Sequence, residues 1–260
     1  MFEGNGKERG AQAFAARLRS PVLTALRRIF GERRCAACSR VFDAGSPEGA
    51  ASGFCPDCLE QLPRRTGGFC PHCGEPSAWA ALPVSDCAHC LKVRPPWQSF
   101  FFHGLHQGLL RRMLIDLKFR DRPQAGEALG GLLASHPACA ALEADAIVPV
   151  PLHRDRLLRR GYNQALEIAR PLARHLDLPV LPGLIARARA TAPQTGADRA
   201  LRARNIAGAF AVSGKARGLR ILLLDDTMTT GATMAEATRG LLAGGAASVM
   251  AAAVSRASLF

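Results

Sequence analysis

The sequence of 260 residues is poor in aromatic side chains and contains no long apolar run. It has one tyrosine, two tryptophans and twelve phenylalanines, so a row of rings on which unpaired bases would stack is not evident. No segment approaches the roughly 18 consecutive apolar residues that a membrane-spanning helix needs. The basic first thirty residues also lack the apolar stretch of a secretory signal. We therefore expect no transmembrane segment and no secretory signal.

A phosphate-binding loop of the G-x-x-x-x-G-K-[ST] type is also missing. The nearest candidate, residues 208–216, has one residue too many between its glycines and has Ala216 where a hydroxyl is needed. This absence excludes a P-loop nucleoside triphosphatase. The apolar strand that ends in two acids at residues 221–226 does resemble the Walker B strand of that class. No segment marks a nucleobase pocket, because only residues 255–260 follow the last expected strand.

The most informative segment is residues 221–233, which read ILLLDDTMTTGAT. Four aliphatic residues predict a strand that is buried on both faces, and Asp225 and Asp226 fall where it ends, at the edge where open α/β sheets bind ligands. The next residues open a helix whose free backbone N–H groups suit a phosphate; they are Thr229, Thr230, Gly231, Ala232 and Thr233. The two acids can bind ribose hydroxyls or a metal ion, and the helix start beside them can bind a phosphate. Together they predict a site for a phosphorylated sugar. The simpler alternatives are acids that only solvate a strand end and an ordinary helix cap.

Two other polar segments are candidates for the same site. A basic loop follows the expected strand at 145–150 and begins with His153 and Arg154; guanidinium groups and backbone N–H groups in such a loop can hold pyrophosphate. A long polar stretch over residues 191–205 has the composition of a mobile flap over a ligand; its candidate residues are Gln194, Arg199 and Arg202. A solvated helix face and an inert surface loop are the respective alternatives.

Eight of the nine cysteines form four C-x-x-C pairs. These are Cys35 with Cys38, Cys55 with Cys58, Cys70 with Cys73, and Cys87 with Cys90. Two such pairs complete a tetrahedral Zn²⁺ site, and a site filled by four cysteines leaves no position for water, so we expect two structural zinc ions. Taken in sequence order, the intervals between pairs are 16 and 13 residues, but interleaved pairing also remains open. Disulfides, an iron–sulfur cluster and redox thiols are the alternatives.

The order of apolar segments predicts the fold class. Strands are expected at residues 100–102, 145–150, 210–212, 221–224 and 247–254, separated by helices at 104–119, 122–134, 162–176 and up to 243. The strand at 145–150 is expected to be the first of the parallel sheet. Such alternation predicts an α/β fold with a doubly wound parallel sheet. We expect three parts, namely a basic N-terminal extension (1–30) with an amphipathic helix at 17–30, a cysteine-rich module (31–94) and the α/β domain (95–260). Of the formal net charge of +13, the last domain carries nine, from 21 basic and 12 acidic residues. This excess favours phosphate-bearing partners.

Together these motifs resemble the ComF family. The resemblance covers roughly residues 33–256 and includes, besides the cysteine pairs and the 225–233 motif, the segments Leu117-Lys118-Phe119, 148–154, 160–164, 194–196, Arg204-Asn205 and Ala209-Phe210. Departures are mild: Met228 is bulky for its loop, and residues 120–122 replace a glycine-containing turn.

The resemblance implies a double zinc ribbon fused to a type I phosphoribosyltransferase-like domain. It implies that Asp225 and Asp226 contact the ribose of 5-phosphoribosyl 1-pyrophosphate (PRPP), that residues 229–233 bind its 5′-phosphate, and that His153 and Arg154 lie near the pyrophosphate with Mg²⁺. It also implies a cytoplasmic role in natural competence, with single-stranded DNA and other competence proteins as partners. We rank an uptake factor first, an active phosphoribosyltransferase second, and a zinc-stabilised adaptor with a vestigial site third.

Overall fold

The computed structural model describes residues 32–43, 53–120, 122, 125–189 and 205–258. The helix expected at residues 17–30 and the flap residues Gln194, Arg199 and Arg202 lie outside these ranges. Among the described helices, none combines the length and the apolar character that crossing a bilayer requires.

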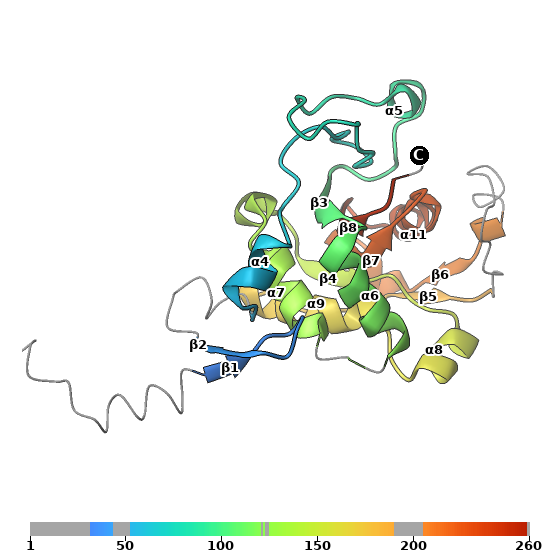
Figure 1. The fold of residues 1–260 in the computed structure, drawn as a ribbon. Coiled ribbons are helices and arrows are strands. Elements are labelled where there is room, and N and C mark those ends of the chain that lie inside the picture. Colours follow the sequence, from blue (N-terminus) through green and yellow to red (C-terminus); the bar gives the residue numbers. More distant parts are fainter. Residues whose placement is uncertain (1–31, 44–52, 121, 123–124, 190–204, 259–260) are drawn as a thin grey trace, which may run out of the picture.

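The centre of the molecule is a sheet of four parallel strands (Figure 1). In spatial order they are β3 (Phe100–Leu105), β8 (Ser248–Arg256), β7 (Arg220–Met228) and β4 (Ala146–Pro149). Leu222 and Leu224 enter the core on one face of the sheet, whereas Ile221 and Leu223 enter the core on the other. The expected parallel α/β sheet, with a central strand that is buried on both faces, is confirmed.

Two expectations about the strands were wrong. The strand at 145–150 is not the first of the sheet, since β3 already pairs in parallel with β8 through Phe100 and Ala251. The strand at 221–224 also does not stop at the acids: β7 continues to Met228, which pairs with Arg256. Backbone pairing needs no apolar side chain, so the polar end of β7 extends along the polar end of β8 after β4 has ended beside Leu224.

Helices cover both faces of the sheet. The first core contains residues of α6 (Gly108–Phe119), α7 (Ala125–Ala134) and α9 (Gln164–Leu176). The second core contains residues of α11 (Ala232–Ala243) and of the antiparallel pair β5 (Ile185–Arg187) and β6 (Phe210–Val212). The short helix α8 (Arg154–Arg160) follows β4, and 3₁₀ turns lie at Pro137–Ala141 and Gly214–Ala216.

The cysteine-rich region contains little regular structure. Its elements are the antiparallel strands β1 (Glu32–Arg34) and β2 (Val41–Asp43) and the helices α4 (Pro56–Glu60) and α5 (Ala88–Lys92). Phe54 and Leu62, beside the first cysteine group, are buried in the same core as α7. The second group stands above the end of the sheet (Figure 1), where Trp97 Nε1 donates a hydrogen bond to the carbonyl of His72 at 2.7 Å.

Candidate functional site

The turn between β7 and α11 has the form of an anion cradle. Gly231 caps the helix with a φ of 78°, a left-handed conformation that glycine adopts without strain. Thr230 is buried, and its Oγ1 accepts a hydrogen bond from the Ala232 N–H at 3.4 Å. The first backbone N–H groups of α11 have no partner within the helix and favour a negative charge at this end.

The two acids lie in the last part of β7, directly before this turn. Asp226 is 4% exposed, and its carboxylate contacts the ammonium of Lys118 on α6. Thr227 Oγ1 donates to the same carboxylate at 2.9 Å, and Gln164 Nε2 donates to it at 3.4 Å. Asp225 accepts a hydrogen bond at 2.8 Å from the backbone N–H of Asp226. The structure therefore brings the acids and the phosphate loop together as one continuous segment.

The surroundings separate the pKa values of the two carboxyl groups. Burial raises the pKa of Asp225 well above its usual value, and the neighbouring charge of Asp226 raises it further. Burial alone also raises the pKa of Asp226, but the ammonium of Lys118 and hydrogen bonds from Lys118 and Thr227 outweigh this effect and lower it. One acid therefore favours its ionised form and the other favours its proton; a divalent cation would favour ionisation of both, because it stabilises both carboxylates.

A polar network behind the acids was missed by the sequence analysis. Lys118 Nζ donates to Thr227 Oγ1 at 3.3 Å, Ser255 Oγ donates to the same oxygen at 3.2 Å, and His106 Nδ1 lies 3.0 Å from Ser255 Oγ. These groups come from α6, β7, β8 and the turn after β3. The signal was the lysine between two apolar residues, Leu117-Lys118-Phe119, which had been noted only as part of a resemblance.

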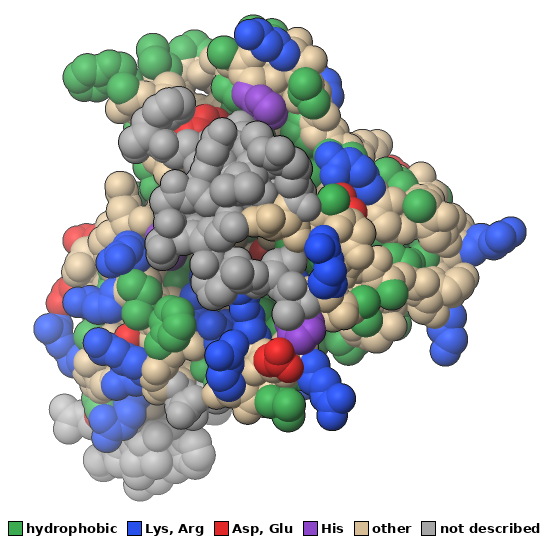
Figure 2. Space-filling view, turned by 90° about the vertical axis from the view of Figure 1, so that its right-hand side faces the viewer, with side chains coloured by type: hydrophobic (Ala, Val, Ile, Leu, Met, Phe, Trp, Pro, Cys, Tyr) green, Lys and Arg blue, Asp and Glu red, His purple; other side chains and the backbone are tan. Residues whose placement is uncertain are grey.

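The basic loop after β4 is the N-terminal part of α8. His153 caps this helix, since its Nδ1 accepts the Asp155 N–H at 3.3 Å, and its backbone bridges to Arg187 of β5. Arg154 is exposed on the first turn. Arg160, at the other end of α8, donates to Gln164, which in turn donates to Asp226. Figure 2 shows a face on which Lys and Arg side chains outnumber Asp and Glu.

The cysteine pairs form two groups in sequence order. One consists of Cys35, Cys38, Cys55 and Cys58, and the other of Cys70, Cys73, Cys87 and Cys90; within each group the sulfur atoms lie within 4.8 Å of one another. This spacing excludes the interleaved pairing, and all nine cysteines of the chain are free thiols rather than disulfides. The ninth, Cys139, packs against the core, and burial raises its pKa to about 11.

Each group has the donor set of a structural zinc site. Four thiols at this separation can surround one tetrahedral Zn²⁺ ion, with none of its four positions left for water. In the first group, burial opposes ionisation of Cys35, but hydrogen bonds from backbone N–H groups of Cys55, Cys38 and Ala37 lower its pKa to about 7. His72 is directed elsewhere, since its Nε2 lies 3.1 Å from the carboxylate of Asp86.

Known proteins similar to this chain include a domain family and several relatives of similar length. The sequence pattern of the phosphoribosyl transferase domain family matches residues 162–258. The DNA utilization protein YhgH of Salmonella typhimurium is 36% identical over 202 residues, which are 76% of this chain and 87% of that protein. Competence protein F of Haemophilus influenzae is 31% identical over 195 residues, which are 72% of this chain and 83% of that protein.

Similar solved structures include two enzymes. Glutamine PRPP amidotransferase from B. subtilis, complexed with ADP and GMP, has a TM-score of 0.38 at 20% identity and covers 54% of this chain and 30% of its own. Adenine phosphoribosyltransferase from Thermoanaerobacter pseudethanolicus has a TM-score of 0.32 at 16% identity and covers 55% and 82%. From its relatives and its paired cysteine groups, the chain belongs to the ComF family.

Proposed function

We propose that this protein binds the Mg²⁺ complex of PRPP at the carboxyl edge of β7 and acts in the handling of single-stranded DNA during natural competence. The observation that carries the first half is the continuity of Asp225 and Asp226 with the anion cradle of residues 229–233. A ribose held by the acids would present its 5′-phosphate to the N–H groups at the start of α11, because both belong to one strand and the turn after it.

The acidic and basic residues of the site would contact different parts of the ligand. Asp226, kept ionised by Lys118, would accept hydrogen bonds from ribose hydroxyls, and Asp225 would give up its proton as the cation arrives. Mg²⁺ would supply a positive charge between the carboxylates and the pyrophosphate, using the oxygen ligands that it prefers. On the same edge, His153 and Arg154 would lie beside the pyrophosphate, with Arg187 bridged to His153 from β5.

The DNA role is supported by the relatives and by charge. Two kinds of relative bear names that refer to DNA utilization and to competence, and the net charge of +13 favours a polyanion. Contact with DNA would be mainly electrostatic and would weaken steeply with salt. With this role we place the protein in the cytoplasm, with other competence proteins as partners, and assign two structural zinc ions to the module at 31–94 and PRPP to the domain at 95–260.

Catalysis is a second candidate function, favoured by the cations around the site. Arg156 and Arg187 contribute positive charge on the same side as Asp225, which interacts electrostatically with Arg187. Fixed positive charge of this kind stabilises a departing pyrophosphate and the ribosyl centre that it leaves behind. An active phosphoribosyltransferase would transfer ribose 5-phosphate from PRPP to an acceptor base. A zinc-stabilised adaptor with a vestigial site would neither bind PRPP nor transfer its ribose 5-phosphate.

One experiment separates these functions. Binding of Mg·PRPP by calorimetry and release of pyrophosphate, with and without a pool of nucleobases, are compared between the wild type and the Asp225→Asn, Asp226→Asn variant. We expect binding that the variant loses while its melting temperature stays close to that of the wild type. Release of pyrophosphate that depends on a nucleobase would establish a phosphoribosyltransferase. Binding of PRPP without release of pyrophosphate would support the uptake factor. Equal PRPP affinity of both proteins would contradict the assigned site.

A further inference from the structure

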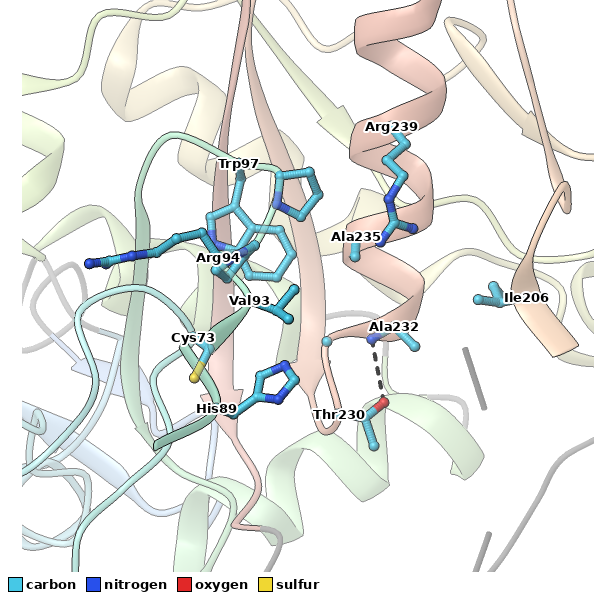
Figure 3. Close-up of a pocket in the computed structure, with 13 residues that line it drawn as sticks. Cys73, His89, Val93, Arg94, Trp97, Ile206, Thr230, Ala232, Ala235 and Arg239 are labelled. Carbon is cyan, nitrogen blue, oxygen red and sulfur yellow. Dashed lines mark hydrogen bonds between the residues drawn. The ribbon is translucent and has the colours of Figure 1, made fainter. Parts of the chain in front are cut away.

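Two aromatic rings in the described part of the chain are exposed to solvent. Of the Phe, Tyr and Trp side chains in these ranges, Phe119 and Trp79 are the exposed ones, at 72% and 70%. The other tryptophan, Trp97, is 7% exposed and borders a crevice between the second cysteine group and α11 (Figure 3). Burial stabilises a large ring, so a ring left in water is one that a partner can still cover.

Phe119 faces neither the core nor the sugar-phosphate site. Each residue of an α-helix is turned by about 100° from the one before it, so Phe119 lies on nearly the opposite side of α6 from Leu117. The buried side chains of this helix are Leu109, Leu110, Met113, Leu114 and Leu117. The residue before the ring, Lys118, reaches Asp226. Neither the packing of α6 nor the contact with the acids therefore requires a ring at position 119.

A guanidinium lies over one face of this ring. The Cζ atom of Arg160, the last residue of α8, is 5.3 Å from the ring centroid of Phe119, within the roughly 6 Å at which a cation is attracted to an aromatic face. The hydroxyl of Tyr162 donates to the carbonyl of Leu117, and this bond holds the end of α8 beside the end of α6 (Figure 1). Since Phe119 is 72% exposed, the face of the ring away from Arg160 is open.

The surroundings of the ring are strongly basic. The helix α8 has four arginines and one aspartate among its seven residues. Lys118 and Arg120 flank Phe119 in the sequence, and the side chains of Arg120 and Arg159 are exposed. Figure 2, whose face includes α8, shows Lys and Arg side chains beside hydrophobic ones in its lower half. A strand of phosphates that crosses the open ring would therefore meet cations on its way.

We propose that Phe119 is a stacking position for an unpaired base of single-stranded DNA. The base would lie on the open face of the ring, opposite Arg160, and the phosphates on either side of it would contact Arg120 and Arg159. Stacking needs only a flat π-face, so this position accepts any base, and the arginines supply the attraction for the strand. The inference rests on the DNA role proposed above and names one place at which that DNA is bound.

The test measures binding of a fluorescein-labelled oligothymidylate to the full-length, zinc-loaded protein by fluorescence anisotropy. Phe119→Ala should weaken binding about tenfold, which is the effect of losing one stack between a base and a ring. Phe119→Trp should keep the affinity of the wild type, because an indole offers a π-face as well. The tryptophan emission of this variant should also be quenched by the oligonucleotide more than that of the wild type. Because Phe119 is exposed, these variants should fold normally.

Two control variants match Phe119 in exposure. Leu158, on α8, is also 72% exposed but has no π-face, so Leu158→Ala should change the affinity less than about twofold. Trp79 has an exposed ring without the basic surroundings, since residues 76–86 contain no Lys or Arg and one Asp. Trp79→Ala should therefore bind the oligonucleotide as tightly as the wild type does.

Salt and duplex DNA separate stacking from charge. Phe119→Ala should weaken binding by the same factor at every salt concentration, because stacking releases no counterion. Arg159→Gln should reduce the slope of log affinity against log salt by about 0.7, the value for one phosphate of a single strand. The bases of a duplex are already stacked on one another, so Phe119→Ala and the wild type should bind duplex DNA equally.

The outcomes distinguish this inference from the function on which it rests. A wild-type protein that does not bind the oligothymidylate would overturn both the DNA role and the stacking position. Binding by the wild type that Phe119→Ala retains in full would overturn the stacking position alone. Equal losses in Phe119→Ala and Leu158→Ala would also overturn it, and would indicate an apolar surface for a protein partner instead.

Discussion

The ammonium of Lys118 on α6 contacts the carboxylate of Asp226 on β7, and this ion pair is largely withdrawn from water. The side chains are 21% and 5% exposed. Lys118 therefore does for Asp226 what solvent does for a surface acid, because it stabilises the negative charge where water cannot. Among the described residues, it is the cation that forms an ion pair with an acid of the candidate site.

Lys118→Met should destabilise the protein and weaken PRPP binding together. Removing one partner of a buried pair leaves an uncompensated charge, so we expect a loss of about 3 kcal/mol in the free energy of unfolding at pH 7. Without Lys118, burial raises the pKa of Asp226 above its unfolded value, so the loss should shrink as the pH falls toward 4 and the carboxyl group takes up a proton. Urea unfolding from pH 4 to 7 measures this; Lys118→Arg keeps the charge and serves as the control. A loss that does not change with pH would contradict the assignment.

Arg256→Lys should be costly although it preserves the charge. Arg256 is completely buried, and its guanidinium donates to the carbonyl of Cys73 at 2.8 Å, to the carbonyl of Met228 at 3.3 Å and to the carboxylate of Glu75. A lysine ammonium cannot reach these separate acceptors at once. We expect the free energy of unfolding to fall by about 2–3 kcal/mol.

The matched control is Arg239→Lys, since Arg239 forms an exposed pair with Glu236. A change below about 0.5 kcal/mol is expected there. Equal effects of the two substitutions, measured by chemical denaturation, would show that the buried guanidinium does not join the second cysteine group to β8.

Loss of zinc should affect the two cysteine groups differently. Cys58 lies in the same core as α7, whereas Cys90 belongs to a small separate cluster of cysteines. Cys58→Ser should therefore lower the melting temperature of the whole protein. Cys90→Ser should change the Trp97 fluorescence but leave the main melting transition in place. Each variant should bind one zinc per chain where the wild type binds two; two zinc ions in either variant would contradict the assigned ligands.

The sequence allowed local features to be predicted. Contacts between segments that are distant in the sequence could not be predicted from it. The buried strand before Asp225 and the C-x-x-C pairs depend on neighbouring residues, and both are confirmed. Lys118 and Thr227 are 109 positions apart, and Arg256 and Glu75 are 181 apart, so no spacing rule joins them. The extension of β7 escaped prediction because it follows from pairing with β8 rather than from its own side chains. The roles given to Gln194, Arg199 and Arg202 stay predictions.

Gly130→Ala should destabilise the packing of α7 on α9. Alanine favours a helix over glycine by about 1 kcal/mol in isolation. Here a Cβ would lie 2.6 Å from the backbone oxygen of Ile168 and would overlap Pro171, so the helices would have to separate. We expect a net loss of about 2 kcal/mol in thermal or urea unfolding. Gly240→Ala on α11, whose Cβ would come within 3.3 Å only of a Val212 methyl group, should be close to neutral; the same loss at both positions would contradict this explanation.

His136 should make the stability of the protein depend on pH. Its ring packs on Phe101 with centroids 5.0 Å apart, and its Nδ1 accepts the Ala138 N–H at 3.1 Å, which requires that nitrogen to carry no proton. Burial, together with the charges of Arg64 and His103, lowers the pKa of His136 to about 4 from an ordinary value of 6.5. Between these two pH values the imidazole of His136 is protonated in the unfolded chain but neutral in the folded chain. Stability is therefore complete above pH 6.5 and falls as the pH decreases toward 4.

His136→Asn isolates this contribution, because asparagine can still accept the Ala138 N–H but does not titrate. The partial exposure of the ring reduces the effect, and we expect the wild type to lose about 1–2 kcal/mol more than the variant between pH 7 and pH 4.5. Urea unfolding at saturating zinc gives the difference directly, since acid release of zinc occurs in both proteins and cancels. If the two proteins lose stability in parallel, the imidazole is not held neutral by its burial.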